Sequence, residues 1–415
     1  MPGRALLPPP RAPGAAFRLA ALTLACAPLG GCGAPPSPPP PAFRVAWTFE
    51  PAGRGAVAAS PLVVGDRVFA AVIHDLGLAH FGAVYCLDRR TGRREWKFDD
   101  GGRMQHMIST PCFTDGRVYL GEGMHGNFVC KFYCLDSAGG RKCWDFEAAG
   151  HIESSPCVAG GTVFFGAGDD GVHALDAATG KPRWHFRGDF HVDAGPAVVG
   201  GRLYAGSGVS RRNKRTEAFC LDADTGRPVW RTPTDLPVWA APAADGADVF
   251  VVLGNGRLSE SAAPPEKPRG ALLRLDAATG RQAWRYDVPD GVLVRPSVDA
   301  GRVYFGARDG CCYCLDRAKG GLVWKQDVGG PVVAAPCLCG DRLYVAAGEG
   351  RVCCLGAGDG RPVWVFDVAA HSRTRPRLFS APVVVAEEGG RRRIYFGAEL
   401  RNPVSSAALL YCLED

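Results

Sequence analysis

The sequence predicts an all-β protein, an eight-bladed β-propeller of four-stranded antiparallel blades. One observation is a repeat of about 40 residues, the length of a four-stranded propeller blade. In seven copies an apolar stretch ends in a Leu that is followed nine residues later by Trp, namely Trp96, Trp144, Trp184, Trp230, Trp284, Trp324 and Trp364. A second observation is a proline that opens each unit, at Pro61, Pro111, Pro156, Pro196, Pro242, Pro296, Pro336 and Pro382. Eight prolines predict eight blades.

Each unit divides into four short strands, as the third unit illustrates. The predicted strands are Pro156–Ala159, Thr162–Gly166, Val172–Asp176 and Arg183–Phe186. Gly180 stands in the turn between the last two strands, where a positive φ is expected. Long connections remain between the second and third strands and between successive units.

The two ends of the chain are predicted to close the ring. The last unit contains Leu413 but ends at Asp415, before any Trp, whereas the segment Arg44–Phe49 carries Trp47 with no Leu-Asp before it. We therefore expect the N-terminal strand to complete the C-terminal blade, which removes two open edges. Trp47 and the seven repeat tryptophans are predicted to dock neighbouring blades, and truncating one should cost about 3–5 kcal/mol.

The N-terminus differs in composition from the repeats. Arginines precede an apolar run from Leu19 to Leu29, as in an export signal, and Leu29-Gly30-Gly31-Cys32 resembles the lipobox of bacterial lipoproteins. We expect a signal peptide at 1–31, lipidation of Cys32, a proline-rich tether at 32–43 and the propeller at 44–415. The protein would then be exported and anchored to a membrane facing the periplasm. A plain cleaved signal with an incidental cysteine is the alternative.

Charge and cysteine content narrow the possible functions. The formal net charge of +6 would fall to +3 on removal of the predicted signal, which gives no reason to expect a nucleic-acid partner. Most of the 17 cysteines recur at fixed repeat positions and indicate small core residues. No CxxC pairs have the spacing of a zinc site, and any disulfide pairing of the 15 cysteines after Cys32 is left open.

One face of the predicted ring carries most of the additional residues. Connections between second and third strands share this face with the connections between blades, and such loops commonly carry function. Candidate binding residues there are His106, His125, His151, His191, His371, Arg295, Arg375 and Arg377. We expect no metal site and no catalytic residues. The alternative is that the segments Met104-Gln105-His106-Met107 and Met124-His125 supply soft ligands to copper.

The segment Ala174–Trp184, with its counterparts Ala218–Trp230 and Ala271–Trp284, resembles the tryptophan motif of the pyrroloquinoline-quinone (PQQ) repeat family. The resemblance covers residues 44–415, and Gly356 in place of the repeat Asp is a departure. One branch of the family, the quinoprotein dehydrogenases, binds PQQ and a divalent cation over the propeller axis. The PQQ-like branch lacks the cofactor and includes BamB-like lipoproteins, which scaffold outer-membrane protein assembly.

The resemblance implies a non-catalytic scaffold or protein-binding module in the cell envelope, without a cofactor, of the kind that acts in outer-membrane protein assembly. The alternative is a PQQ-dependent dehydrogenase with PQQ and Ca²⁺, and a sensor module in signalling is a third hypothesis. A dehydrogenase needs carboxylate and amide groups near the quinone. The candidates are Glu122, Glu153, Asp169, Asp193, Asp309, Glu349, Glu399, Asn127 and Asn402. The identity of the envelope partner and the oligomeric state are left open.

Overall fold

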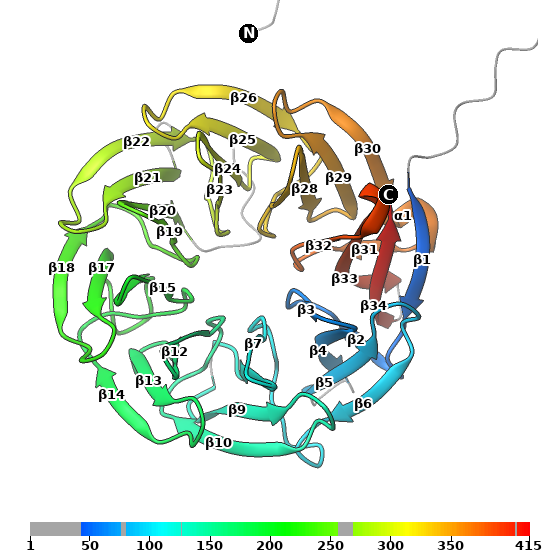
Figure 1. Cartoon of the computed structure of the whole chain (residues 1–415), viewed down its shortest axis with the longest axis horizontal. Helices are drawn as coiled ribbons and strands as arrows, with labels where there is room; N and C mark the ends of the chain where they lie inside the picture. The colour runs from blue at the N-terminus through cyan, green and yellow to red at the C-terminus, as the bar shows by residue number, and fades with distance from the viewer. Residues whose placement is uncertain (1–42, 76–79, 126, 256–268, 403–404) are drawn as a thin grey trace, which may run out of the picture. The chain divides into compact units, whose positions relative to one another are not determined.

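The computed structural model describes residues 43–75, 80–125, 127–255, 269–402 and 405–415. Eight antiparallel sheets surround a central axis, as the sequence predicts (Figure 1). The signal peptide, Cys32 and the tether up to residue 42 lie outside the described residues. Among the described residues, no helix is long and apolar enough to cross a membrane.

Each blade has four strands, called A to D from the axis outwards. Blade 1 comprises β3 (Leu62–Val64), β4 (Arg67–Asp75), β5 (His80–Asp88) and β6 (Arg94–Phe98), and blade 2 comprises β7 (Cys112–Thr114), β8 (Arg117–Gly121), β9 (Cys130–Asp136) and β10 (Lys142–Ala148). Blade 3 comprises β11 (Cys157–Ala159), β12 (Thr162–Gly166), β13 (Val172–Asp176) and β14 (Pro182–Phe186), and blade 4 comprises β15 (Ala197–Val199), β16 (Arg202–Gly206), β17 (Glu217–Asp222) and β18 (Pro228–Pro233). A short strand β2 (Arg54–Ala56) also pairs with β4 in blade 1.

The second half of the ring repeats the same order. Blade 5 comprises β19 (Ala243–Asp245), β20 (Asp248–Gly254), β21 (Gly270–Asp276) and β22 (Gln282–Val288), and blade 6 comprises β23 (Ser297–Val298), β24 (Arg302–Gly306), β25 (Cys311–Asp316) and β26 (Leu322–Asp327). Blade 7 comprises β27 (Cys337–Cys339), β28 (Arg342–Ala347), β29 (Arg351–Gly356) and β30 (Pro362–Asp367), and blade 8 comprises β32 (Val383–Ala386), β33 (Arg392–Asn402), β34 (Ser405–Glu414) and β1 (Arg44–Phe49). Blade 8 also contains β31 (Arg375–Arg377), and the helices α1 (Val368–Ser372) and η1 (Glu388–Gly390) lie in connections.

The N-terminal strand closes the ring. β1 pairs antiparallel with β34, with Trp47 opposite Cys412, which confirms the predicted closure. Phe43, which the sequence places at the end of the tether, packs against Trp364 with ring centroids 4.7 Å apart. The contact of this partly buried ring holds the first strand against blade 7.

Neighbouring blades are linked through the repeat tryptophans. The Trp144 indole Nε1 of blade 2 donates to the Ala177 carbonyl in the C–D turn of blade 3 at 3.2 Å. Gly180 in that turn has φ of 74°, and a Cβ there would lie 2.7 Å from the Trp144 ring. The turn therefore needs glycine for its positive φ and because the Trp144 ring leaves no room for a side chain. The link from blade 7 to blade 8 differs, because the Trp364 indole donates to the Asp415 side chain, and not to a backbone carbonyl, at 3.1 Å.

The core lies between the blades, where buried side chains of adjacent sheets interdigitate. Phe132 of blade 2 stacks on Phe165 of blade 3 with centroids 4.1 Å apart. Cysteine stands opposite tryptophan in several ladders, as Cys134 does opposite Trp144 and Cys220 opposite Trp230. The 15 cysteines of the described segments are free thiols, ten of them buried.

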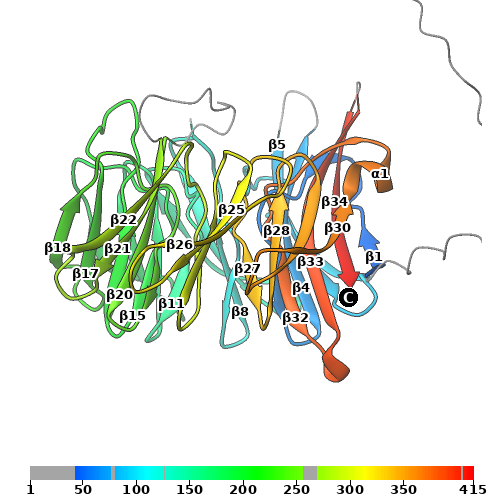
Figure 2. The same cartoon turned by 90° about the horizontal axis from the view of Figure 1, so that it is seen from above.

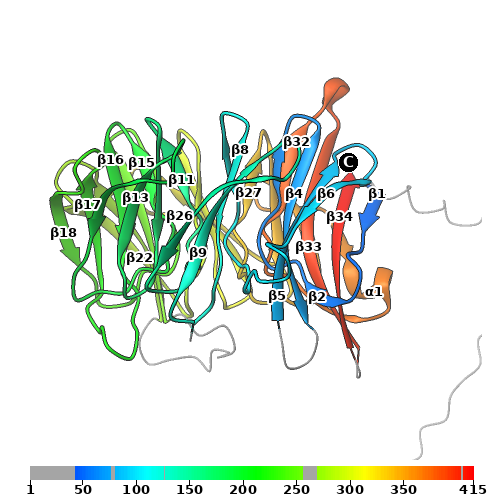
Figure 3. The ribbon, with the colours of Figure 1, turned by 90° about the horizontal axis from the view of Figure 1, so that it is seen from below.

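The B–C loops and the D–A connections share one face of the ring, here called the loop face; Figures 2 and 3 show the ring edge-on. Backbone hydrogen bonds tie the two kinds of segment together. Ile152 donates to Glu122 at 3.0 Å, and Val332 donates to Ala307 at 3.1 Å. Side chains from successive blades are thereby brought into contact.

Candidate functional site

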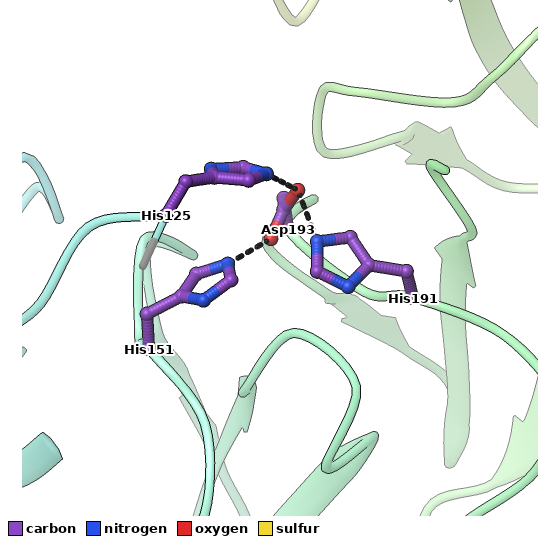
Figure 4. Close-up of side chains that lie close together, drawn as sticks. All are labelled: His125, His151, His191 and Asp193. Carbon is purple, nitrogen blue, oxygen red and sulfur yellow. Dashed lines mark hydrogen bonds and ion pairs between the residues drawn. The ribbon is translucent and has the colours of Figure 1, made fainter. Parts of the chain in front are cut away.

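Three histidines and an aspartate converge on the loop face (Figure 4). We call His125, His151, His191 and Asp193 the loop-face cluster. His125 comes from the B–C loop of blade 2, His151 from the connection between blades 2 and 3, and the other two from the connection between blades 3 and 4. One potential ligand atom from each of the four residues lies within 4.8 Å of the others.

Asp193 is at the centre of the cluster. One of its oxygens lies 3.0 Å from His151 Nε2. The other lies 2.8 Å from His191 Nε2 and 3.4 Å from His125 Nε2. Asp193, His151 and His191 are buried, whereas the His125 side chain is 47% exposed. All three imidazoles thus direct Nε2 towards the same carboxylate, and one ring faces solvent.

Local backbone pairing fixes the connection that supplies two cluster members. Val192 is buried and exchanges backbone hydrogen bonds with Gly168 at 3.0 Å, while Gly208 donates to the His191 carbonyl at 2.8 Å. Side chains alternate along extended backbone. With Val192 directed into the core, His191 and Asp193 project together to the opposite side.

A second layer of carboxylates orients two of the rings. His125 Nδ1 lies 2.6 Å from Glu153, and His191 Nδ1 lies 2.7 Å from Asp169. The Asn213 amide donates to Asp169 at 2.9 Å. A carboxylate on Nδ1 places the proton there and leaves Nε2 as a lone-pair donor, which is how metal-binding histidines are commonly held.

The carboxylates and imidazoles of the loop-face cluster shift one another's pKa values. The hydrogen bond to Glu153 raises the pKa of His125 to about 9. Burial opposes charging of His191, but the nearby Asp193 and Asp169 carboxylates outweigh it and raise the pKa of that imidazole. Burial alone would raise the pKa of Asp193, yet contacts with His151 and His191 hold it well below its usual range. The cluster therefore attracts positive charge, which protons or a metal ion can provide.

Two buried atoms of the cluster have no hydrogen-bond partner. They are His191 Nε2 and Asp193 Oδ2, which face one another at 2.8 Å without the geometry of a hydrogen bond. Leaving buried polar atoms unsatisfied costs about 1–3 kcal/mol each. Both are good ligands for a divalent transition metal.

Blade 3 holds a second group of this composition, which we call the blade cluster: Asp170, His173 and His185. His173 Nε2 lies 2.9 Å from the Asp170 carboxylate, and the His173 and His185 rings stack at 3.8 Å. Asp170 also accepts from the Arg187 guanidinium at 2.7 Å and from the Ala149 backbone at 3.0 Å. Arg187 supplies the positive charge that this carboxylate requires, so the blade cluster has the contacts of a structural network.

The other predicted loop-face residues do not join the loop-face cluster. His371 lies in α1 and faces the Tyr411 hydroxyl at 3.4 Å. Arg375 and Arg377 are exposed on β31, and Arg295 lies just before Pro296, the proline that precedes the A strand of blade 6. His106 accepts a backbone hydrogen bond from Gly123 through its carbonyl. Three of the eight candidates are thus brought together.

The structure corrects one part of the copper alternative, the expectation that Met104-Gln105-His106-Met107 offers methionine ligands on the loop face. Met104 and Met107 are almost fully buried and belong to the core between blades 1 and 2. Apolar packing between β4, β5 and β8 accounts for both side chains. The sulfur atoms of Met104 and Met107 therefore lie in the core and are not available as ligands on the loop face.

The carboxylates proposed for a dehydrogenase separate into two groups. Asp193 belongs to the loop-face cluster, and Glu153 and Asp169 contact its histidines. Glu122 instead accepts from the backbone nitrogens of Gln105 and Lys131 and from a tyrosine hydroxyl, and burial raises its pKa. Glu399 pairs with Arg401, and Asp309 accepts from the Cys311 backbone. The amide of Asn127 accepts from the Met124 backbone within the B–C loop of blade 2.

A sequence signal for the cluster exists in the repeat. His106, His151 and His191 each stand five residues before the proline of the next blade. In the latter two an acidic residue follows two positions later, Glu153 or Asp193. Trp239, outside the tryptophan repeat, was not predicted as a site residue, and its ring lies 6.0 Å from His125.

The B–C loop that carries His125 also exposes apolar side chains. Phe128 is 77% exposed, Val129 57% and Met124 39%. The Asn127 backbone donates to Met124 at 2.9 Å and closes the loop. The loop therefore presents an aromatic side chain to solvent beside the loop-face cluster.

Comparisons with known proteins agree with this architecture. The family model described as "Outer membrane protein assembly factor BamB" matches residues 80–191, 187–264 and 268–399. No match is found among curated protein sequences. The structure is similar to that of BamB from Moraxella catarrhalis, with 15% identity, 89% of this chain and 97% of that chain covered, and a TM-score of 0.62.

Solved enzymes share the fold as well. A quinohemoprotein alcohol dehydrogenase from Comamonas testosteroni matches with 14% identity, 90% of this chain and 76% of that chain, and a TM-score of 0.67. One from Pseudomonas putida HK5 matches with 17% identity, the same coverages and a TM-score of 0.65. At these identities the structural likeness shows the fold, and the family model decides membership: the chain belongs to the BamB-like family of PQQ-repeat propellers.

Proposed function

We propose that this protein is a non-catalytic binding module of the cell envelope that takes part in the assembly of outer-membrane proteins. Its loop face would bind an apolar segment of a partner protein, and lipidated Cys32 would hold it at the membrane. The proposal extends the description of the family model to this chain.

The observation that carries the proposal is the exposed Phe128 loop. Aromatic side chains supply much of the binding energy at protein interfaces, and exposed apolar groups in a contiguous patch mark such surfaces. Phe128, Val129 and Met124 belong to one loop of the face that also carries the charged cluster. An apolar centre beside polar groups is the usual composition of a protein interface.

The types of metal-ligating side chain that converge favour the binding-module hypothesis over the PQQ-dependent dehydrogenase hypothesis. Both clusters of potential metal ligands among the described residues contain histidine nitrogens. Ca²⁺, which the dehydrogenase hypothesis requires beside PQQ, takes oxygen ligands. The residues that converge therefore do not match that ion, and we derive no reaction through PQQ.

Site-specific photo-cross-linking in bacterial cells tests the proposal. A photoreactive amino acid would replace Phe128 in one variant and Ala178 in a control. Ala178 is exposed in the C–D turn of blade 3, on the opposite face. We expect defined adducts with outer-membrane assembly proteins from position 128 and none from position 178.

Equal cross-linking from both positions, or none from position 128, would contradict the proposal. Purified protein should also show no saturable change in quinone absorbance when PQQ and Ca²⁺ are added. Dye-linked alcohol oxidation under those conditions would establish the dehydrogenase alternative instead.

A further inference from the structure

We propose that the loop-face cluster binds one Zn²⁺ ion through its three imidazole Nε2 atoms and the Asp193 carboxylate. The inference concerns other side chains than Phe128, although His125 lies on the same loop, and it does not rest on the proposed function.

The spacing of the ligand atoms fits a four-coordinate ion. Zinc–nitrogen and zinc–oxygen bonds of about 2.0–2.1 Å in a tetrahedron place neighbouring ligand atoms roughly 3.3 Å apart. The Asp193 oxygens already lie 2.8 to 3.4 Å from the three Nε2 atoms. One ligand atom from each of the four residues lies within 4.8 Å of the others, and the partly exposed His125 side chain has room to move closer and complete the coordination.

The unpartnered atoms point to an ion at this place. His191 Nε2 and Asp193 Oδ2 are buried and meet at 2.8 Å without forming a hydrogen bond. An unprotonated His191 Nε2 would turn its lone pair towards the carboxylate, and a metal ion that takes the place of the Nε2 proton would satisfy both atoms. The His191 ring is 1% exposed, so little solvent reaches it from outside.

The surrounding residues prepare two rings as ligands. Glu153 and Asp169 hold the Nδ1 atoms of His125 and His191, which leaves both Nε2 atoms available. No such arrangement occurs in the blade cluster, where Arg187 already contacts the central carboxylate at 2.7 Å. A guanidinium at that distance would repel a second cation.

The ligand set also favours a particular ion and role. Three imidazoles and one carboxylate suit a borderline-soft divalent ion and disfavour Ca²⁺ or Mg²⁺, which take oxygen ligands. Four protein ligands leave no open position for a substrate, as in structural zinc sites. The ion would join a loop of blade 2 to the connections that flank blade 3.

Titration of the purified full chain with Co²⁺ tests the inference, because Co²⁺ reports tetrahedral coordination through its visible absorption. Metal is first removed with a chelator. We expect saturation at one equivalent, intense visible bands and displacement of Co²⁺ by Zn²⁺. His125→Gln and His191→Gln should each weaken binding by more than about 100-fold. His173→Gln in the blade cluster is the matched control and should bind like the wild type.

Absence of Co²⁺ binding to the folded wild type would overturn the inference. So would unchanged binding in His125→Gln or equal loss in His173→Gln. Circular dichroism establishes folding, and His125, with its side chain 47% exposed, provides a variant that the core tolerates if His191→Gln does not fold. A negative titration leaves the cross-linking test valid, since Phe128 is not a ligand.

Discussion

The loop-face cluster and the blade cluster contain the same residue types in different surroundings. Each has a buried aspartate in contact with histidine, at 3.0 Å in the first and 2.9 Å in the second. In the blade cluster Asp170 also contacts Arg187 and a backbone nitrogen. In the loop-face cluster, Asp193 meets three imidazoles and no arginine, and one of its oxygens lacks a hydrogen bond.

The difference shows that composition alone does not identify a metal site. A buried carboxylate needs a compensating positive charge, which a protein supplies through arginine, protonated histidine or a metal ion. Where arginine is present the network is complete. In the loop-face cluster, where arginine is not among the contacts of Asp193, the positive charge comes from protonated histidine or from a metal ion that replaces those protons.

The largest expected effect is the stabilisation of the folded protein by Zn²⁺. An ion that binds the native state alone adds about 2.7 kcal/mol at a free concentration 100 times Kd. Denaturant unfolding with and without Zn²⁺ measures this difference. We expect it in the wild type and in His173→Gln, and we expect it to vanish in His191→Gln.

The next effect concerns Asp170 and low pH. Burial alone would raise the pKa of this carboxyl, but contacts with His173 and the Ala149 backbone hold it at about 2, against an ordinary value of 3.8. A folded pKa below the unfolded value stabilises the fold above about pH 4, and the shift corresponds to about 2 kcal/mol. This contribution is lost as the pH falls from about 4 to 2.

Asp170→Asn should therefore be less stable than the wild type at pH 6 by about 2 kcal/mol, and roughly half of the difference should be gone at pH 3. Urea unfolding at the two pH values measures it. A difference that stays constant with pH would show that packing, and not the charge of Asp170, stabilises the blade cluster.

A smaller effect tests the outer layer of the loop-face cluster. Glu153→Gln keeps a hydrogen-bond acceptor near His125 but removes the charge, and should weaken Zn²⁺ binding about tenfold. Competition with a chromophoric chelator measures the affinity. If Glu153→Gln binds as tightly as the wild type, the Nδ1 contact does not prepare the ring for a metal.

The fold was predictable from the sequence, whereas the cluster was predictable in part. The Trp repeat and its turn glycines encode contacts between successive blades, as Trp144 and Gly180 show, so local sequence specifies the ring. His151 and His191 occupy one repeat position and could have been paired from it. His125 could not, because it lies in a B–C loop whose path depends on contacts such as that with Glu153.

His106 shows the limit of the repeat argument. It holds the same position in the preceding connection, but Ile108 stands where the other two connections carry Glu153 and Asp193. Without that carboxylate nothing at the repeat position draws the imidazole into a shared site. The identity of the neighbouring residues, more than the spacing, decides which histidines converge.

The smallest expected effect is on local motion. Zn²⁺ bound to His125 should slow amide hydrogen exchange in the B–C loop that carries Phe128, while exchange around His173 stays unchanged. Exchange followed by mass spectrometry with and without Zn²⁺ measures it. Equal slowing in both regions would indicate general stabilisation and not a local tether.

Anomalous X-ray diffraction at the zinc absorption edge tests the central claim most directly. Crystals grown with Zn²⁺ should show a peak about 2.0–2.1 Å from the Nε2 atoms of His125, His151 and His191 and from an Asp193 oxygen, with none at the blade cluster. Crystals that contain zinc elsewhere but show no peak at the loop-face cluster would contradict the account.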